Sequence, residues 1–270
     1  MRFHWMASWL LFLGWGITAP AMEFVPLQQK AQAHSLTGSS QLNDSLYSNP
    51  AASSFTQVYS VDGTFQMPKS FAVSILDTKT STIGGALGYF RHYLPGETAS
   101  PFQGAKLALA GKVEESVAVG VAGKLIWGLD AQGNDARMHD ADFGVLTNFG
   151  FIQAGFTIRN IAGGKVDLKQ DREWGVGGRV GYQDTLFLSL ATTSTAENMK
   201  PYQYSIGAEY ISPYFIALKG GFRTQPDLHK SYWGAGASFV SPKISFHYAV
   251  EFPQQSVEKT EHVVGTTILF

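Results

Sequence analysis

Apolar and polar side chains alternate with unusual regularity along the carboxyl-terminal part of the chain. In one segment, Ile244, Phe246, Tyr248, Val250 and Phe252 alternate with Ser245, His247, Ala249 and Glu251. Successive side chains of a β-strand point to opposite faces, so this pattern predicts a strand with one apolar and one polar face. Many such strands cannot all cover one soluble core, but they can close into a ring whose apolar face meets lipid. The sequence therefore predicts an all-β fold, a transmembrane antiparallel β-barrel.

The alternating segments number fourteen, an even number as expected for a single-chain bacterial barrel. They are predicted at residues 55–66, 70–77, 82–93, 104–111, 117–128, 140–148, 150–159, 173–182, 185–193, 202–211, 215–223, 231–240, 243–252 and 261–270. Short connections at 112–116, 148–150, 183–184, 212–214 and 241–243 alternate with longer ones at 94–103, 129–140, 160–172, 194–201, 224–230 and 253–260. Short turns at one end and longer loops at the other are typical of barrels with periplasmic turns and extracellular loops.

The amino-terminal part divides into an export signal and a segment without strands. Residues 1–21 have a weakly basic start, an apolar core and the sequence Ala19-Pro20-Ala21, which is typical of a cleavable signal peptide. A membrane-anchoring helix is the alternative, but the apolar run is shorter than the ~18 residues that a spanning helix needs. Residues 22–54 are polar and aperiodic, and we expect them to form a hatch inside the barrel of residues 55–270. The predicted location is the outer membrane of a Gram-negative-type bacterium.

Composition excludes several classes of protein. The chain has no cysteine, which excludes a lipid-modified amino terminus and a disulfide framework. The formal net charge of −1 argues against nucleic acid as a partner. The 29 glycines and the low share of charged residues, 15%, suit strands packed against lipid and against each other.

The two faces of the predicted strands carry different residues. Aromatic side chains near strand ends are predicted to face outward, toward the membrane interfaces: Trp127, Trp174, Tyr182, Tyr202, Tyr210, Trp233, Phe252 and Phe270. Charged side chains are predicted to line the lumen: Asp62, Lys106, Lys124, Asp142, Arg159, Arg179, Glu209, Lys219, Arg223, His247 and Glu251. We expect ion pairs between Glu209 and Lys219 and between Arg223 and Glu251. These charges either hold a packed lumen together or select a solute.

Several motifs resemble the FadL-type barrels, which include the long-chain fatty-acid transporter and the PorV protein of type IX secretion. The motif Asn49-Pro50-Ala51 resembles the end of their hatch region. The segment around Glu209 and the one ending at Arg223 resemble one of their hairpins. The resemblance implies fourteen strands, an amino-terminal hatch, passive uptake of hydrophobic molecules and a sideways exit through a gap in the wall. From the residues alone, Pro50 is also explained as the residue that marks the start of the first strand.

Chemistry other than transport finds little support in the sequence. His247 and Ser245 are predicted to face the lumen ~7 Å apart, too far for a direct hydrogen bond, so no catalytic residues are predicted. Oxygen-bearing residues between Asp130 and Asp142 do not have the spacing of a calcium loop, and no metal or cofactor is predicted. Phe270 is interpreted as a terminal signal for the barrel assembly machinery.

Three functions follow as hypotheses. The first is passive transport of small hydrophobic molecules. It predicts that the hatch lines part of the lumen with apolar side chains such as Phe24, Val25, Leu27, Leu36 and Leu46, and that strand pairing is broken beside them. The second is a PorV-like scaffold for envelope or secreted proteins, or a structural barrel without transport. The third is a general polar channel. Outer-membrane lipid and the assembly machinery are the expected partners, with a hydrophobic small molecule under the first hypothesis.

Overall fold

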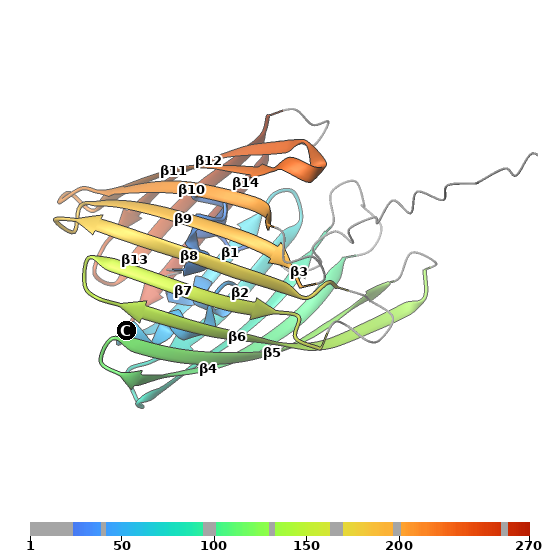
Figure 1. Cartoon of the computed structure of the whole chain (residues 1–270), viewed down its shortest axis with the longest axis horizontal. Helices are drawn as coiled ribbons and strands as arrows, with labels where there is room; N and C mark the ends of the chain where they lie inside the picture. Colours follow the sequence, from blue (N-terminus) through green and yellow to red (C-terminus); the bar gives the residue numbers. More distant parts are fainter. Residues whose placement is uncertain are drawn as a thin grey trace, which may run out of the picture.

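The computed structural model describes residues 24–38, 42–93, 101–129, 133–162, 170–196, 201–254 and 259–270. In these residues fourteen strands form one closed barrel, in which each strand pairs with its neighbours in the chain and β1 pairs with β14 (Figure 1). All pairings are antiparallel, which confirms the fold class and the number of strands. No helix in the described part of the chain is both long and apolar enough to cross a membrane. The predicted export signal, residues 1–21, lies outside the described residues.

The strand bounds lie close to those predicted from alternation. They are β1 Tyr59–Gln66, β2 Ser70–Asp77, β3 Ile83–His92, β4 Phe102–Glu114, β5 Val117–Leu129, β6 Asp135–Asn148, β7 Ile152–Arg159, β8 Glu173–Tyr182, β9 Leu186–Thr195, β10 Pro201–Ile211, β11 Ile216–Gln225, β12 Lys230–Val240, β13 Ile244–Pro253 and β14 Glu261–Leu269. Short helices precede them: α1 Leu27–Ala31, η1 Ser35–Gly38, η2 Leu42–Leu46 and η3 Pro50–Phe55. A single helical turn, η4 Pro226–Leu228, lies between β11 and β12.

Burial alternates along the strands as a lipid-facing barrel requires. In β5, Val121 is 53% exposed, whereas its neighbour Ala122 is 2% exposed and faces the lumen. Apolar side chains such as Leu188 and Ile206 are likewise half exposed on the outside. The apolar outer surface is therefore the lipid-facing surface, and the core of the molecule lies inside the ring.

The connections sort by length between the two ends of the barrel. Turns at residues 78–82, 115–116, 149–151, 183–185, 212–215 and 241–243 join strands at the end where Phe270 lies, on the left of Figure 1. At the opposite end the connections at 93–101, 160–172 and 254–260 are the longest. Those at 67–69, 130–134, 196–200 and 226–229 are no longer than the turn at 78–82, so the longer loops predicted at 129–140, 194–201 and 224–230 are largely strand instead. By the convention of such barrels, the end with Phe270 is periplasmic and the other extracellular.

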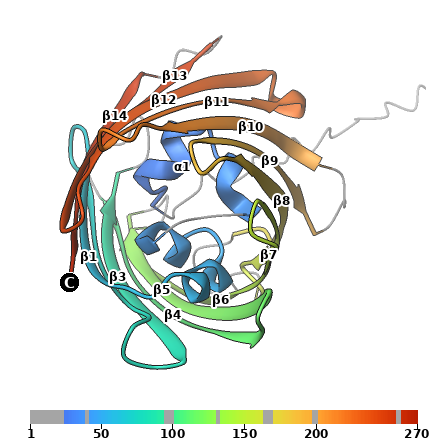
Figure 2. The same ribbon diagram turned by 90° about the vertical axis from the view of Figure 1, so that its left-hand side faces the viewer.

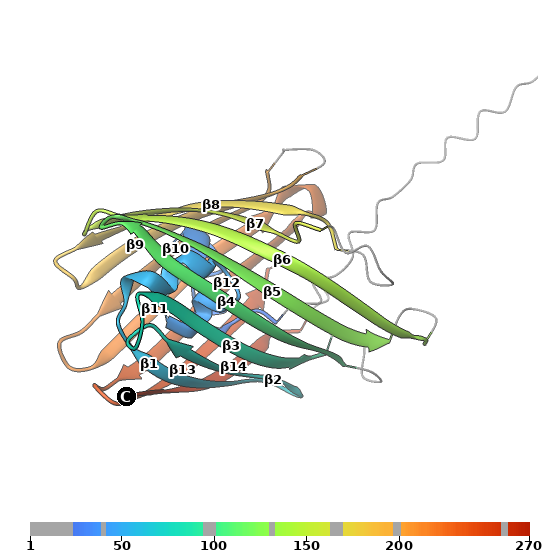
Figure 3. The ribbon, with the colours of Figure 1, turned by 90° about the horizontal axis from the view of Figure 1, so that it is seen from below.

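Two strand starts were predicted wrongly. The first strand was expected from residue 55 with Pro50 at its start, but Pro50 begins η3 and β1 starts at Tyr59. The sixth strand was expected from residue 140, but it starts at Asp135 because alternation continues outward along β6, with buried Met138 between exposed residues. The hairpin of β5 and β6 consequently reaches beyond the strands beside it (Figure 3).

Tyr202 was also placed on the wrong face. The pairing of β9 with β10 shifts register between Pro201 and Gln203, so that Tyr202 is the extra residue of a β-bulge. A bulge reorients the side chain that it carries. The Tyr202 hydroxyl consequently donates to the Glu173 carboxylate at 2.6 Å instead of lying at the lipid interface.

Candidate functional site

The amino-terminal segment packs inside the ring as a hatch, which we define as the described residues 24–38 and 42–55. Figure 2, seen from the periplasmic end, shows its short helices within the circle of strands. Most of its side chains are buried, including Leu36 at 1% and Leu46 at 0% exposed. The hatch therefore fills the central part of the lumen.

Asn49 anchors the hatch to the wall and to itself. Its side chain is fully buried, and its Oδ1 accepts a hydrogen bond from the backbone N–H of Ala51 at 3.1 Å, which caps η3. Its Nδ2 donates to the carbonyl oxygen of Val145 on β6 at 3.2 Å and to that of Thr37 at 3.4 Å. Pro50 follows at the first helical position, where its missing N–H is not needed. Ala51 packs against the apolar wall of β5 and β6.

Replacing Asn49 with alanine is expected to destabilise the hatch by about 1–2 kcal/mol, because the cap is lost and buried carbonyl groups lose their donor. Limited proteolysis of the folded barrel measures this as faster cleavage within the hatch. Replacing exposed Asn134 with alanine is the control, since that residue lies outside the hatch, and it should leave the cleavage rate unchanged. Equal cleavage of the two variants would contradict the anchoring role.

Glycine on the inner face of the wall makes room for the hatch. A Cβ atom added at Gly120 would lie 2.5 Å from the Ala51 nitrogen and 2.6 Å from the Pro50 carbonyl carbon. At each of eight glycines an added Cβ atom would lie within 3.0 Å of a hatch atom: Gly88, Gly120, Gly144, Gly175, Gly207, Gly221, Gly234 and Gly236. These glycines come from seven strands between β3 and β12, so the hatch follows the wall rather than hanging free in the lumen.

The predicted lumenal charges of β7 to β13 form compensated clusters. Lys219 and Arg179 contact opposite oxygens of Glu209, at 3.0 and 2.6 Å. Arg223 contacts Glu251 at 2.9 Å, and Arg159 contacts Glu173 at 2.7 Å. The pairs Glu209–Lys219 and Arg223–Glu251 are thus formed as predicted, and Arg179 joins the first of them from β8, two strands away from β10.

Two of the predicted lumenal residues, Glu251 and His247, contact the hatch. The Glu251 carboxylate also faces His34 of the hatch at 3.6 Å. The Nδ1 of His247 lies 2.9 Å from the Ser238 hydroxyl and 3.3 Å from the Gln28 amide of the hatch. His247 therefore contacts the hydroxyl of Ser238 on β12 and, through Nε2 at 3.3 Å, that of Thr267 on β14, rather than that of Ser245.

Asp44 is a buried acid of the hatch whose surroundings favour the neutral, protonated carboxyl group. Asp44 accepts a hydrogen bond from the backbone N–H of Gln28 at 3.0 Å. Burial, together with the nearby Asp62 carboxylate, raises the pKa of Asp44 to about 8. A protonated carboxyl group adds no net charge to the packed interior.

Lys106, Lys124 and Asp142, which were also predicted to face the lumen, form a further buried cluster. The Asp142 carboxylate lies 2.6 Å from the Lys106 ammonium and 2.9 Å from the Lys124 ammonium. Lys124 also donates to the Asn160 Oδ1 at 2.6 Å, and the Asn160 backbone N–H donates to Asp142 at 3.0 Å. The sequence alone could have indicated this cluster, because the inward-facing Lys106 and Lys124 lie directly opposite each other on the neighbouring strands β4 and β5.

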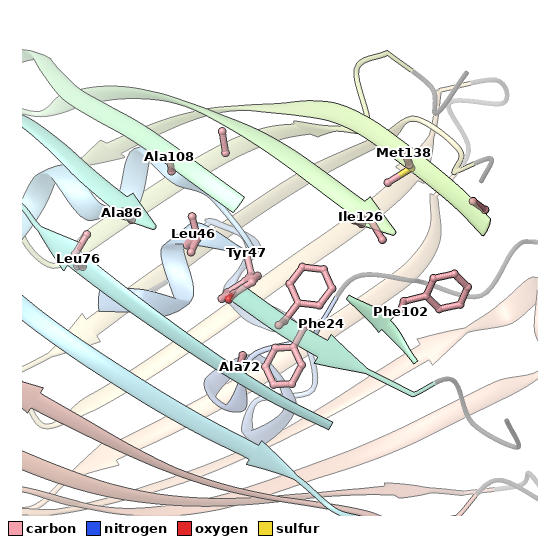
Figure 4. Close-up of a cluster of buried hydrophobic side chains, with 13 residues drawn as sticks. Phe24, Leu46, Tyr47, Ala72, Leu76, Ala86, Phe102, Ala108, Ile126 and Met138 are labelled. Carbon is pink, nitrogen blue, oxygen red and sulfur yellow. The ribbon is translucent and has the colours of Figure 1, made fainter. Parts of the chain in front are cut away.

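The lumen is apolar on one side, toward the extracellular end. Phe24 of the hatch lies with its ring centroid 6.5 Å from that of Phe90 and 6.0 Å from that of Tyr47 (Figure 4). We call this set the apolar lumen cluster: Phe24, Leu46, Tyr47, Ala72, Leu76, Ala86, Phe90, Phe102, Ala108, Ala122, Ile126, Ala136 and Met138. Its wall residues come from β2 to β6, whereas the ion pairs described first lie on β7 to β13. Of the hatch residues expected to be apolar contributors, Phe24 and Leu46 join this cluster, and Leu27 packs elsewhere against β13 and β14.

Two remaining predictions concern the wall. Phe270 is 66% exposed, its ring lies 5.4 Å from that of Tyr59, and its backbone N–H donates to the Tyr59 carbonyl oxygen at 2.9 Å. The expected break in strand pairing is not present, because the ring is closed. The pairing of β6 with β7 is the shortest and ends at Phe143 and Ile158, although β6 continues to pair with β5 as far as Asp135. Among the described residues no cluster of metal ligands is found.

Solved structures with the same fold include a monoaromatic hydrocarbon channel and a toluene transporter. The CymD monoaromatic hydrocarbon channel superposes with a TM-score of 0.65 at 10% identity, over 93% of this chain and 98% of that one. The Pseudomonas putida toluene transporter TodX gives 0.64 at 11% identity, over 89% and 96%. A Pseudomonas aeruginosa FadL homologue gives 0.62 at 10% identity, over 91% and 98%. No protein-family model matches the sequence, and no curated protein is significantly similar to it. At these identities the likeness establishes the fold.

Proposed function

We propose, on the premise that this chain has the fold of the hydrocarbon channels above, that it lies in the outer membrane and lets small hydrophobic molecules cross passively. The likeness in fold covers 89–93% of this chain. The alternation of short turns and longer loops supports the same orientation as in bacterial outer-membrane barrels. Export by the predicted signal of residues 1–21 and assembly through Phe270 belong to this proposal, with outer-membrane lipid and the assembly machinery as partners.

The observation that carries the proposal is the apolar lumen cluster. Barrel interiors are usually polar, since they hold water or packed charges. Here Phe90, Ile126 and Met138 are fully buried on the inner face, where polar residues are expected, near the extracellular end. An apolar surface inside a water-accessible barrel favours a solute that prefers apolar contacts to water.

A hydrophobic molecule can cross the barrel only if packed side chains in the lumen move. The hatch contributes Phe24 and Leu46 to the apolar cluster, and the ring of strands is closed, so a hydrophobic molecule displaces hatch side chains first. A sideways exit further requires two strands to separate. The β6–β7 pair is the place where the fewest ladder hydrogen bonds must break.

Replacing Phe24 with aspartate is expected to lower uptake of a hydrophobic fluorescent probe by roughly tenfold, because a carboxylate in this apolar cluster repels an apolar solute and is itself poorly solvated. Phe24 lies on the hatch and not on a strand, so the barrel still assembles. The measurement is the rate of entry of N-phenyl-1-naphthylamine into vesicles that contain the purified protein.

Replacing Phe24 with leucine is the matched control, which keeps the site apolar and should retain uptake. If neither the unaltered protein nor the leucine variant accelerates entry over protein-free vesicles, the transport proposal is wrong. Steady single-channel conductance with the hatch in place would indicate a polar channel instead.

A scaffold without transport is the second candidate, and the filled lumen favours it. The hatch is anchored by Asn49, by glycine contacts around the ring and by an ion pair between Lys30 and Glu261. A sealed barrel of this kind suits a PorV-like docking role. Absence of uptake together with co-purification of one stable envelope protein would support it.

A further inference from the structure

The outer wall carries a recess where β6 and β7 diverge. A cavity of about 340 Å³ opens there. It is lined by Val121, Ala141, Asp142, Phe143, Ile158, Ile161, Arg172 and Trp174. Val121 is 53% and Ile161 37% exposed, so the recess faces the surroundings of the barrel and not the lumen. It lies beside the end of β7 at Arg159, where Asn160, whose φ is 57°, ends the regular ladder, although the Ile161 N–H still donates to the Ala141 carbonyl oxygen at 3.0 Å.

The rim of the recess is cationic on its extracellular side. Arg172, which lines the cavity, is exposed, and one of its amino groups donates to the Ile161 carbonyl oxygen at 2.5 Å. Above Ala141 on the same outward face of β6 stand His139 and then Arg137, both exposed. Asp135 follows one outward position farther from the recess. The recess therefore has an apolar floor and the Arg172 guanidinium at its rim, and Arg137 lies two outward positions beyond Ala141 on the same face of β6.

We propose that this recess binds one phosphorylated lipid of the outer leaflet, with an acyl chain on the apolar floor and a phosphate between Arg137 and Arg172. Guanidinium groups bind phosphate oxygens in pairs of parallel hydrogen bonds and suit this role better than other cations. An acyl chain alone would not interact favourably with the two arginines. A free phosphate ion would not interact favourably with the apolar floor of Val121, Phe143 and Ile158. The site does not depend on what crosses the lumen.

The test uses the full barrel in detergent micelles and counts bound lipid by native mass spectrometry. The probes are bisphosphorylated lipid A and the same lipid without its phosphates. We expect one tightly retained phosphorylated lipid, with the phosphate-free form retained on the order of tenfold less. The double variant Arg137→Gln, Arg172→Gln should lose this preference. Lys243→Gln, at an exposed lysine of the periplasmic end, should keep it.

Three results would overturn the proposal: equal retention of both lipids, an unchanged preference in the double arginine variant, or loss of the bound lipid to millimolar inorganic phosphate. The last of these would assign the arginines to a phosphate ion. The variant Ala141→Phe tests the acyl-chain site on the apolar floor independently of the arginines at the rim. By filling the recess it should weaken both lipids equally, whereas an unchanged affinity would show that no acyl chain lies there.

Discussion

Replacing Asp142 with alanine is expected to lower the free energy of unfolding of the barrel by about 3–5 kcal/mol. The Asp142 carboxylate contacts the ammonium groups of Lys106 and Lys124, and all three residues are at most 4% exposed. The variant leaves two buried positive charges without the carboxylate that they share, and a buried charge is costly when its partner is removed. Urea titration of the protein folded into lipid vesicles measures the difference.

The same strand supplies a control. Asp135 is exposed at the start of β6, so its replacement with alanine should change the free energy of unfolding by less than about 0.5 kcal/mol. The triple variant Asp142→Leu, Lys106→Met, Lys124→Met should recover most of the loss, because apolar residues of similar volume can replace a buried ionic cluster. Equal effects of the two single aspartate variants would mean that the cluster adds nothing to stability.

Replacing Gly120 with alanine is expected to destabilise the folded protein by about 1–3 kcal/mol and to loosen the hatch. The added methyl group would overlap backbone atoms of Pro50 and Ala51, which cannot rotate away as the end of a long side chain can. Either η3 shifts from the wall or β5 bends. The measurements are urea titration, as above, and the rate of proteolytic cleavage within the hatch.

Gly123 is a matched control three residues along β5. It faces outward, and an added Cβ atom there meets nothing within 4 Å. Its replacement with alanine should leave both measurements close to those of the unaltered protein. If the two glycine variants behave alike, the hatch does not pack against the inner wall as described.

The charged lumen illustrates how far sequence reasoning extended into the candidate site. Inward parity placed Arg159, Arg179 and Glu209 on the same face from alternation alone, because a charge facing lipid is expensive. The pair Glu209–Lys219 was also predictable, since its strands are neighbours in the chain. The contact of Arg179 with Glu209 was not predicted, because it spans β9 and depends on side-chain reach across the lumen.

The hatch contacts were beyond sequence reasoning for a related reason. Asn49 was singled out through a resemblance, but its hydrogen bond to Val145 joins residues that are far apart in the chain. Nothing in the local pattern around either residue specifies the other. The inward glycines likewise look like ordinary wall glycines until the path of the hatch is known.

The sequence by itself determined that the chain forms a ring of fourteen amphipathic strands, which inner faces carry charge, and which end has the longer connections. These follow from the two-residue period of a strand, a property of the local backbone. Only the tertiary structure decided the inward turn of Tyr202, the separation of β6 from β7, and the packing of an apolar cluster against one side of the hatch. Each of these depends on register and on contacts between distant segments, and a local period carries no information about either.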